Sequence, residues 1–188
     1  MKRNSYVLSA ILFVFAIASV NSCKKESGNP FKGNISATFN FVPDYKNGWI
    51  PPNPGPAWYP GSGAGQLTHI GNSKTVFNQY ATLTTTGLNI VGASVNLFYK
   101  ARLDSAGISV PDNVTNVYYD DHHNSIWAVS VSGTNNPVSP TRVEFTILHK
   151  IVGGTGRFEQ ATGAYTINGY FNPQTQQTFF SINGRIDD

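Results

Sequence analysis

The segment that most restricts the fold is glycine-rich, GGTGRFEQATG at 153–163, and it separates two stretches of alternating apolar residues. Side chains at 143–151 alternate between core-type and polar, and the same spacing returns at 165–171. A period of two is typical of β-strands, so the segment between them is predicted to connect two strands. Its first three glycines provide backbone angles that a side chain would forbid, and Phe158 is expected to turn back into the core.

The same glycines do not predict a phosphate-binding loop. Such a loop requires a helix N-terminus after the glycines, where free amide groups face the phosphate. Here the alternating stretch AYTINGYF follows, and Glu159 occupies the place of the third glycine in a dinucleotide-binding motif. The segment is therefore interpreted as structural.

Several other stretches show strand patterns, and none predicts a convincing amphipathic helix. Strands are expected at 34–42, 66–71, 74–83, 88–103, 126–131, 143–151, 165–171 and 178–186, and longer connections at 43–65, 104–113 and 132–140. Many strands joined by short turns predict a sandwich or a barrel. We expect an all-β domain, a single eight-stranded antiparallel β-barrel of the lipocalin-like kind, because closure removes exposed strand edges.

The N-terminus has the features of an export signal. Lys2 and Arg3 precede a short apolar stretch at 6–20, too short to span a bilayer. The chain's single cysteine, Cys23, follows in the sequence Val-Asn-Ser-Cys, which resembles the lipobox of bacterial lipoproteins. The resemblance implies cleavage before Cys23 and diacylation of its sulfur; the alternative is an ordinary secretory signal that ends near a cysteine.

This interpretation divides the chain into a lipoprotein signal peptide at 1–22, a lipidated tether at 23–32 and the barrel domain at 33–188. The partner implied by the anchor at Cys23 is a membrane, since two acyl chains hold a protein stably on a bilayer. Lys24 after the cysteine implies the outer membrane of the cell envelope, with the facing of the domain left open.

The charge balance gives no sign of a nucleic-acid partner. The chain has 13 Lys and Arg residues, and loss of Lys2 and Arg3 with the signal leaves 11 against 10 Asp and Glu residues. No basic field survives on the folded part, so nucleic acid is not expected as a partner. With one cysteine, no disulfide within the chain is expected either.

The glycine-rich segment carries a family resemblance. GGTGRFEQATGAYTINGYF, followed by FFSINGRI, resembles the C-terminal half of dirigent proteins and of the related allene oxide cyclase barrels. QLTHIGNSK at 66–74 is similar to a strand ending found in bacterial relatives of that barrel. The resemblance implies a calycin-like barrel, and it carries over no catalytic residue because the matching positions are structural.

Aromatic residues in the connection 43–65 are the candidate ligand-binding residues. Trp49, Trp58 and Tyr59 lie among prolines, where flat rings stack on a sugar or cover an apolar ligand at a barrel mouth. The alternative is that they plug the barrel end.

Two histidine-containing features are candidates for other chemistry. His149 shares the face of Phe145 and Ile147, which points it into the barrel either as a catalytic base or bonded to a neighbouring hydroxyl. Asp120–His123 offers potential metal ligands, although a polar turn is the preferred interpretation. No metal site and no cofactor are expected.

The leading functional hypothesis is a non-enzymatic, lipid-anchored barrel that binds a small apolar or amphipathic molecule, or an envelope partner. Inward-facing Phe39, Phe41, Phe145 and Phe180 favour a filled interior, whereas an open cavity above roughly 300 Å³ favours a ligand. The alternatives are a cyclase or isomerase type of enzyme that holds a reactive substrate, with His149 as its first candidate residue, and a carbohydrate-binding module that uses Trp49 and Trp58.

Overall fold

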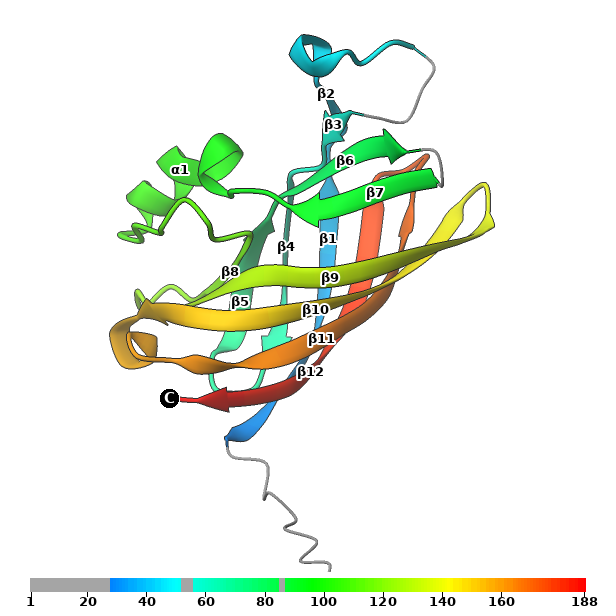
Figure 1. Cartoon of the computed structure of the whole chain (residues 1–188). Coiled ribbons are helices and arrows are strands. Elements are labelled where there is room, and N and C mark those ends of the chain that lie inside the picture. The colour runs from blue at the N-terminus through cyan, green and yellow to red at the C-terminus, as the bar shows by residue number, and fades with distance from the viewer. Residues whose placement is uncertain (1–27, 52–55, 85–86) are drawn as a thin grey trace, which may run out of the picture.

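The computed structural model describes residues 28–51, 56–84 and 87–188. In these residues eight antiparallel strands close into a barrel in the order β1-β12-β11-β10-β9-β8-β5-β4 (Figure 1). A second sheet, in the order β2-β3-β6-β7, lies at one end of the barrel. The predicted fold class, an all-β protein with one closed eight-stranded antiparallel barrel, is confirmed.

The barrel strands are β1 (Asn29–Phe39), β4 (Gly61–Leu67), β5 (Gly71–Phe77), β8 (Asn116–Tyr119), β9 (Ser125–Ser139), β10 (Arg142–Thr155), β11 (Thr162–Asn172) and β12 (Gln177–Asp187). The second sheet contains β2 (Val42–Pro43), β3 (Ala57–Trp58), β6 (Gln79–Thr84) and β7 (Gly87–Gly92). The helical elements within the described residues are α1 (Asn96–Ser105) and two 3-10 turns, η1 (Tyr45–Asn47) and η2 (Gly156–Phe158).

The predicted strand at 88–103 is wrong beyond Gly92. The chain leaves β7 there and forms α1, in which Leu103 alone is buried. A helix that is exposed over most of its surface has no apolar stripe, so its period is not visible in the sequence. The eighth barrel strand is instead β8, whose four residues are all buried because α1 and the segment after it cover its outer face. A strand buried on both faces shows no alternation.

Two predicted connections are also wrong in part. The end of the segment 43–65 belongs to β4, where a Cβ on Gly63 or Gly65 would overlap backbone carbonyl oxygens of β1. These glycines bring β4 unusually close to β1 rather than breaking a strand. Residues 132–139 continue β9, and every residue there is exposed. This part of the β9–β10 hairpin therefore lacks the alternation of apolar and polar residues that would predict a strand.

The barrel is packed solid at one end. Phe31, Tyr118 and Tyr165 meet edge to face with ring centroids 5.3 to 6.1 Å apart, and Phe158 is completely buried beside them in the same core. Strand β1, blue in Figure 1, begins at this end, which we call the closed end. Residues 29–32, assigned above to the tether, are part of that strand.

The turn that the sequence singles out seals the closed end. Gly153 and Gly156 have φ values of +140° and +61°, a region that side chains rarely adopt. Gly154 is required for a different reason, because a Cβ there would overlap the carbonyl oxygen of Ser125 and lie 2.8 Å from Phe158. The predicted inward turn of Phe158 is confirmed. The predicted connection is confirmed for residues 156–161, whereas 153–155 extend β10 and 162–163 begin β11.

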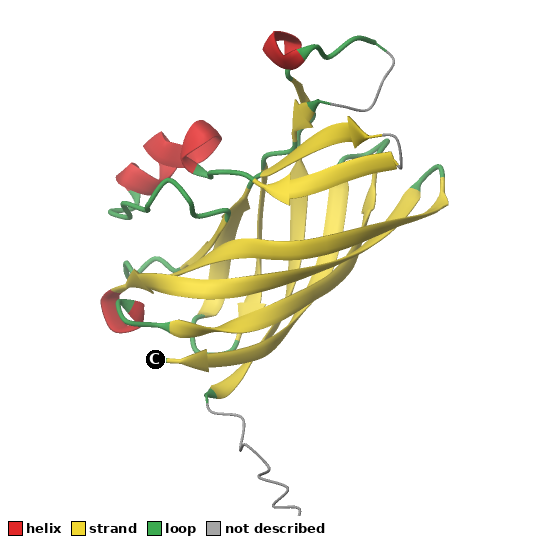
Figure 2. Cartoon of the chain, viewed as in Figure 1, coloured by secondary structure: helices red, strands yellow, loops and turns green. Residues whose placement is uncertain are grey.

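A smaller second core lies outside the barrel wall. It joins α1 and the segment after it to the outer faces of β5 and β8, and consists of Val76, Val95, Leu103, Ile108, Val110, Val114, Val117 and Tyr119. Figure 2 shows the helices, in red, outside the yellow barrel. Among the described residues, no helix has the length and apolar character needed to cross a membrane.

Candidate ligand-binding cavity

The barrel interior is open at the end opposite Phe158. The cavity there has a volume of about 380 Å³. Six phenylalanines and one tyrosine are among the residues that line it, namely Phe39, Phe41, Tyr59, Phe77, Phe145, Phe171 and Phe180. The volume falls within the range of small-molecule sites.

The expectation that phenylalanines fill the interior is wrong at this end, because the rings pack against one another along the wall. Phe39 meets Phe171 edge to face at 5.4 Å, and Phe145 lies 6.3 Å from Phe171. Gly169 pairs with Phe145 across the sheet, and a Cβ on Gly169 would approach the Phe145 ring to 2.9 Å. The missing side chain therefore lets the Phe145 ring lie close to the wall, which leaves the centre open.

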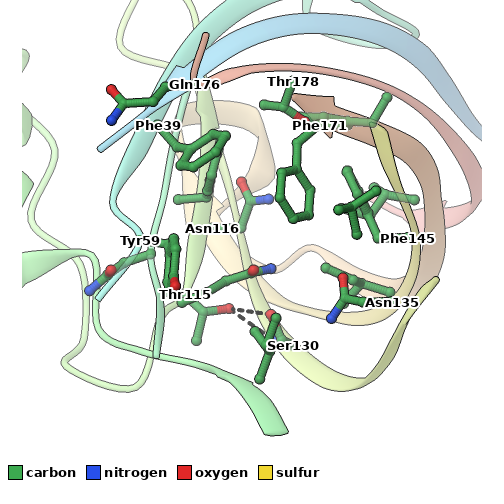
Figure 3. A pocket seen from close by; sticks show the side chains of 18 of the residues that line it. Phe39, Tyr59, Thr115, Asn116, Ser130, Asn135, Phe145, Phe171, Gln176 and Thr178 are labelled. Atoms are coloured by element: carbon green, nitrogen blue, oxygen red, sulfur yellow. Dashed lines mark hydrogen bonds between the residues drawn. The ribbon is translucent and has the colours of Figure 1, made fainter. Parts of the chain in front are cut away.

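Polar side chains also line the cavity, and three of them are joined by hydrogen bonds. Asn78, Thr115, Ser130 and His149 all line the cavity. The Thr115 and Ser130 hydroxyls are 3.1 Å apart, and the Ser130 hydroxyl lies 3.1 Å from Nε2 of His149. Figure 3 shows Phe39 and Phe171 on one side of the cavity and the hydrogen-bonded Thr115 and Ser130 on the other. We call these four residues the polar row.

His149 points into the barrel, as its position in the strand pattern predicts. Its side chain is 2 % exposed and stacks on Tyr165, with ring centroids 4.9 Å apart and an interplanar angle of 4°. Its Nδ1 has no hydrogen-bond partner among the described residues. Burial lowers the pKa of His149 to about 4, and the Ile147 carbonyl opposes that effect in part. The ring is therefore neutral at physiological pH.

Among the described residues that line the cavity, none carries a charge at that pH, since the side chains other than His149 are aliphatic, aromatic, hydroxyl or amide. Burying a charge without a partner costs several kcal/mol in such an environment. The cavity therefore selects against ions, and it offers aromatic surface together with a few hydrogen-bonding groups on one side.

The three predicted ligand-binding aromatics lie in different surroundings. Tyr59 lines the cavity, next to Phe39 and Phe41. Trp49 and Trp58 are not part of the cavity lining. Trp49 packs against Phe41, a residue of the lining, with ring centroids 5.8 Å apart.

Trp58 lies in β3 and packs on Tyr80 and Phe98, with ring centroids 5.1 and 6.3 Å away. The Tyr80 hydroxyl donates to the buried carboxylate of Asp44 at 2.8 Å, which ties β6 to the turn at η1. These contacts make Trp58 part of the packing of the second sheet.

Residues 120–123 form the polar turn that the sequence favours. One oxygen of Asp120 accepts from the backbone amides of His122 and Asn124 at 2.8 and 2.9 Å. His123 has a φ of +62°, and its Nδ1 lies 3.0 Å from the Ala106 carbonyl oxygen. The described residues contain no group of three or more side chains placed to hold a metal ion.

Sequence reasoning missed three members of the polar row, namely Asn78, Thr115 and Ser130. Asn78 falls between β5 and β6, inside the single strand expected at 74–83, and Thr115 directly precedes the strand β8 that was not expected. Ser130 pairs with His149 across the sheet only because of a register shift between Leu148 and His149. No local pattern marks such positions.

Cys23 lies outside the described residues. The chain matches no protein-family model, no curated protein and no solved structure.

Proposed function

We propose that this protein binds one small, uncharged and largely apolar molecule inside its barrel, without transforming it. The observation that carries this proposal is the cavity of about 380 Å³, walled by aromatic rings, in a barrel whose other end is packed solid. An eight-stranded barrel either fills its interior with side chains or holds one small ligand. An apolar pocket with a few convergent polar groups is the usual form of a small-molecule site.

The low pKa of His149 favours binding over catalysis. A general base works best when its pKa lies near the operating pH, and burial lowers the pKa of His149 to about 4. In the cyclase or isomerase alternative, the barrel would fix the shape of a reactive substrate through the same wall, with His149 as a hydrogen-bonding group.

The carbohydrate alternative depends on exposed flat rings. Trp49 and Trp58 each pack against two other aromatic rings, which leaves them half-buried. Such packing favours a structural role for both, and the cavity therefore remains the better candidate for recognition.

We further propose that a lipid on Cys23 holds the barrel at the outer membrane of the cell envelope. Strand β1 begins at the closed end (Figure 1). The residues that line the cavity lie toward the other end of the barrel. In this arrangement the cavity faces away from the membrane that carries the protein, so the ligand enters from the aqueous side.

A neutral fluorescent probe tests the binding proposal. N-phenyl-1-naphthylamine brightens in apolar surroundings, and it is titrated into the mature chain with Cys23→Ser, which removes any competing lipid. We expect saturable binding with one probe per chain. Val143→Trp places a large side chain in the cavity lining and should weaken binding at least tenfold.

Leu148→Trp is the matched control, because Leu148 lies on the outer face of the same strand and is 39 % exposed. It should leave the dissociation constant unchanged. Equal affinities in the two tryptophan variants, or no saturable binding by the parent chain, would contradict the proposal.

A further inference from the structure

The turn beyond β2 presents large apolar side chains to solvent. Tyr45 is 70 % exposed and Ile50 is 65 % exposed, the two highest values among the exposed large hydrophobic side chains of the described residues. Both lie in the segment 44–50, which is built around η1. Figure 1 shows η1 as the short cyan coil beyond β2, at the end of the molecule opposite the start of β1. We call residues 44–50 the η1 tip.

Hydrogen bonds hold the η1 tip in one shape. The buried Asp44 carboxylate accepts from the backbone amide of Asn47 at 3.2 Å and from its side-chain amide at 2.5 Å. The Tyr80 hydroxyl donates to the same carboxylate, and the Trp49 backbone amide donates to the Asp44 carbonyl at 3.0 Å. The two exposed apolar side chains are therefore displayed by an ordered turn.

The charge that the η1 tip presents to solvent is positive. Its charged residues are Asp44 and Lys46. The Asp44 carboxylate is buried against its hydrogen-bond donors, whereas Lys46 is exposed. Tyrosine and tryptophan side chains gather at the headgroup level of membranes, and lysines near a bilayer are attracted to anionic lipids. The composition of the η1 tip therefore fits a bilayer surface.

A series of aromatic contacts joins the η1 tip to the cavity. Tyr45 meets Trp49 edge to face with ring centroids 5.3 Å apart, and the Trp49 and Phe41 centroids are 5.8 Å apart. The Phe41 ring lies 5.6 Å from that of Tyr59, and both of these residues line the cavity. The exposed apolar side chains are thus continuous with the wall of the site proposed for an apolar ligand. Such a ligand partitions from water into bilayers.

We infer that the η1 tip docks on a lipid bilayer, with Tyr45 and Ile50 among the headgroups, and that the ligand passes between this bilayer and the cavity. The choice of partner rests on the proposed function, because an apolar ligand is stored in bilayers. In the anchored arrangement this is a bilayer that faces the barrel from the aqueous side, not the one that carries Cys23. A second copy of the chain fits less well, since a contact between two tips would bring two Lys46 side chains together.

Flotation with vesicles tests the docking. The mature chain with Cys23→Ser is mixed with vesicles of phosphatidylcholine and phosphatidylglycerol, and we expect saturable binding as the lipid concentration rises. The double variant Tyr45→Ser, Ile50→Ser should bind at least about tenfold more weakly, since two large side chains no longer leave water. Lys46→Glu should weaken binding about fivefold or more through the anionic lipid. All three side chains are exposed, so these changes should not affect folding.

The matched control is the double variant Leu148→Ser, Val152→Ser. These two apolar side chains are 39 % and 38 % exposed on the outer face of β10, away from the η1 tip. The control should bind vesicles as the parent chain does. Each variant is also titrated with N-phenyl-1-naphthylamine in the absence of vesicles. The tip variants should keep the probe affinity of the parent chain, which shows that the barrel is folded and its cavity intact.

The outcomes separate the docking from the proposed function. No vesicle binding by the parent chain, or equal binding by the tip variants and the control, would overturn the inference, while probe binding would leave the proposed function in place. Absence of probe binding would contradict the proposed function, whereas tip-dependent vesicle binding would still establish the docking. Self-association of the parent chain in place of vesicle binding, abolished in Tyr45→Ser, Ile50→Ser, would assign the tip to a second copy and overturn the inference.

Discussion

Replacement of Phe158 by alanine tests whether the glycine-rich turn closes the barrel. Phe158 is completely buried in the main core, with the backbone of Gly154 against it and the Arg157 guanidinium 4.8 Å from its ring. Loss of a buried phenylalanine removes its transfer free energy and leaves a cavity, at a cost of about 3–5 kcal/mol. Domains of this size have about 5–15 kcal/mol of stability, so the variant should lose a large part of it.

The matched control is Phe179→Ala on the outer face of β12, where the side chain is 40 % exposed. Its cost should stay within about 1 kcal/mol, because surface substitutions rarely exceed that value. Urea unfolding followed by circular dichroism gives both values, and an unchanged m-value confirms that the same surface unfolds. A loss below about 1 kcal/mol in Phe158→Ala, or equal losses in the two variants, would refute a buried anchor at this turn.

Three further predictions follow from the structure. Because the folded barrel accepts a proton on His149 only near pH 4, whereas the unfolded chain accepts it near pH 6.5, the free energy of unfolding should fall as the pH falls through this window. The fall should be about 3 kcal/mol larger in the wild type than in His149→Phe, measured by urea unfolding at several pH values; equal slopes would contradict it. Gly154→Ala should lower the free energy of unfolding by more than about 3 kcal/mol, because the new Cβ would overlap the Ser125 carbonyl oxygen. Gly71→Ala should lower it by about 1–2 kcal/mol, because Gly71 has a φ of +77° but open space around its Cβ. The reverse order would contradict the close packing at Gly154. Cys23→Ser should move the protein from the membrane fraction to the soluble fraction of the cell envelope; an unchanged distribution would contradict the lipid anchor.

The sequence predicted the barrel where strands have one buried and one exposed face. In β10 and β11 the inward residues recur at every second position, and the turn between them contains Gly156, whose φ of +61° strongly favours glycine. The alternation of the strands and the glycines of the turn both favour the arrangement in which the closed end is packed, so the sequence pattern predicts the structure correctly there.

The prediction of strands failed where a second layer of residues covers a strand, or where two strands lie very close together, because the sequence there does not alternate between apolar and polar residues. Strand β8 is covered on its outer face by the second core, so it lacks alternation, and α1 is exposed except at Leu103, so it lacks an apolar stripe. The glycines of β4 allow this strand to approach β1 closely. From composition alone, a segment so rich in glycine is predicted to be a loop. Each error arises from a tertiary contact that no short window of sequence contains.

The candidate site was predictable only in part for the same reason. His149 follows from the strand period, and Tyr59 from the aromatic content of its segment. Asn78, Thr115 and Ser130 come together through strand pairing and a register shift, which are properties of the closed sheet.

Diffraction from a crystal of the protein pressurised with xenon tests the central claim, an open apolar interior, most directly. Xenon enters cavities that are dry and apolar. We predict a xenon atom inside the barrel, between the Phe39–Phe171 pair and the polar row. An interior without xenon, in which the rings of Phe145 and Phe171 fill the space now assigned to the cavity, would contradict the account.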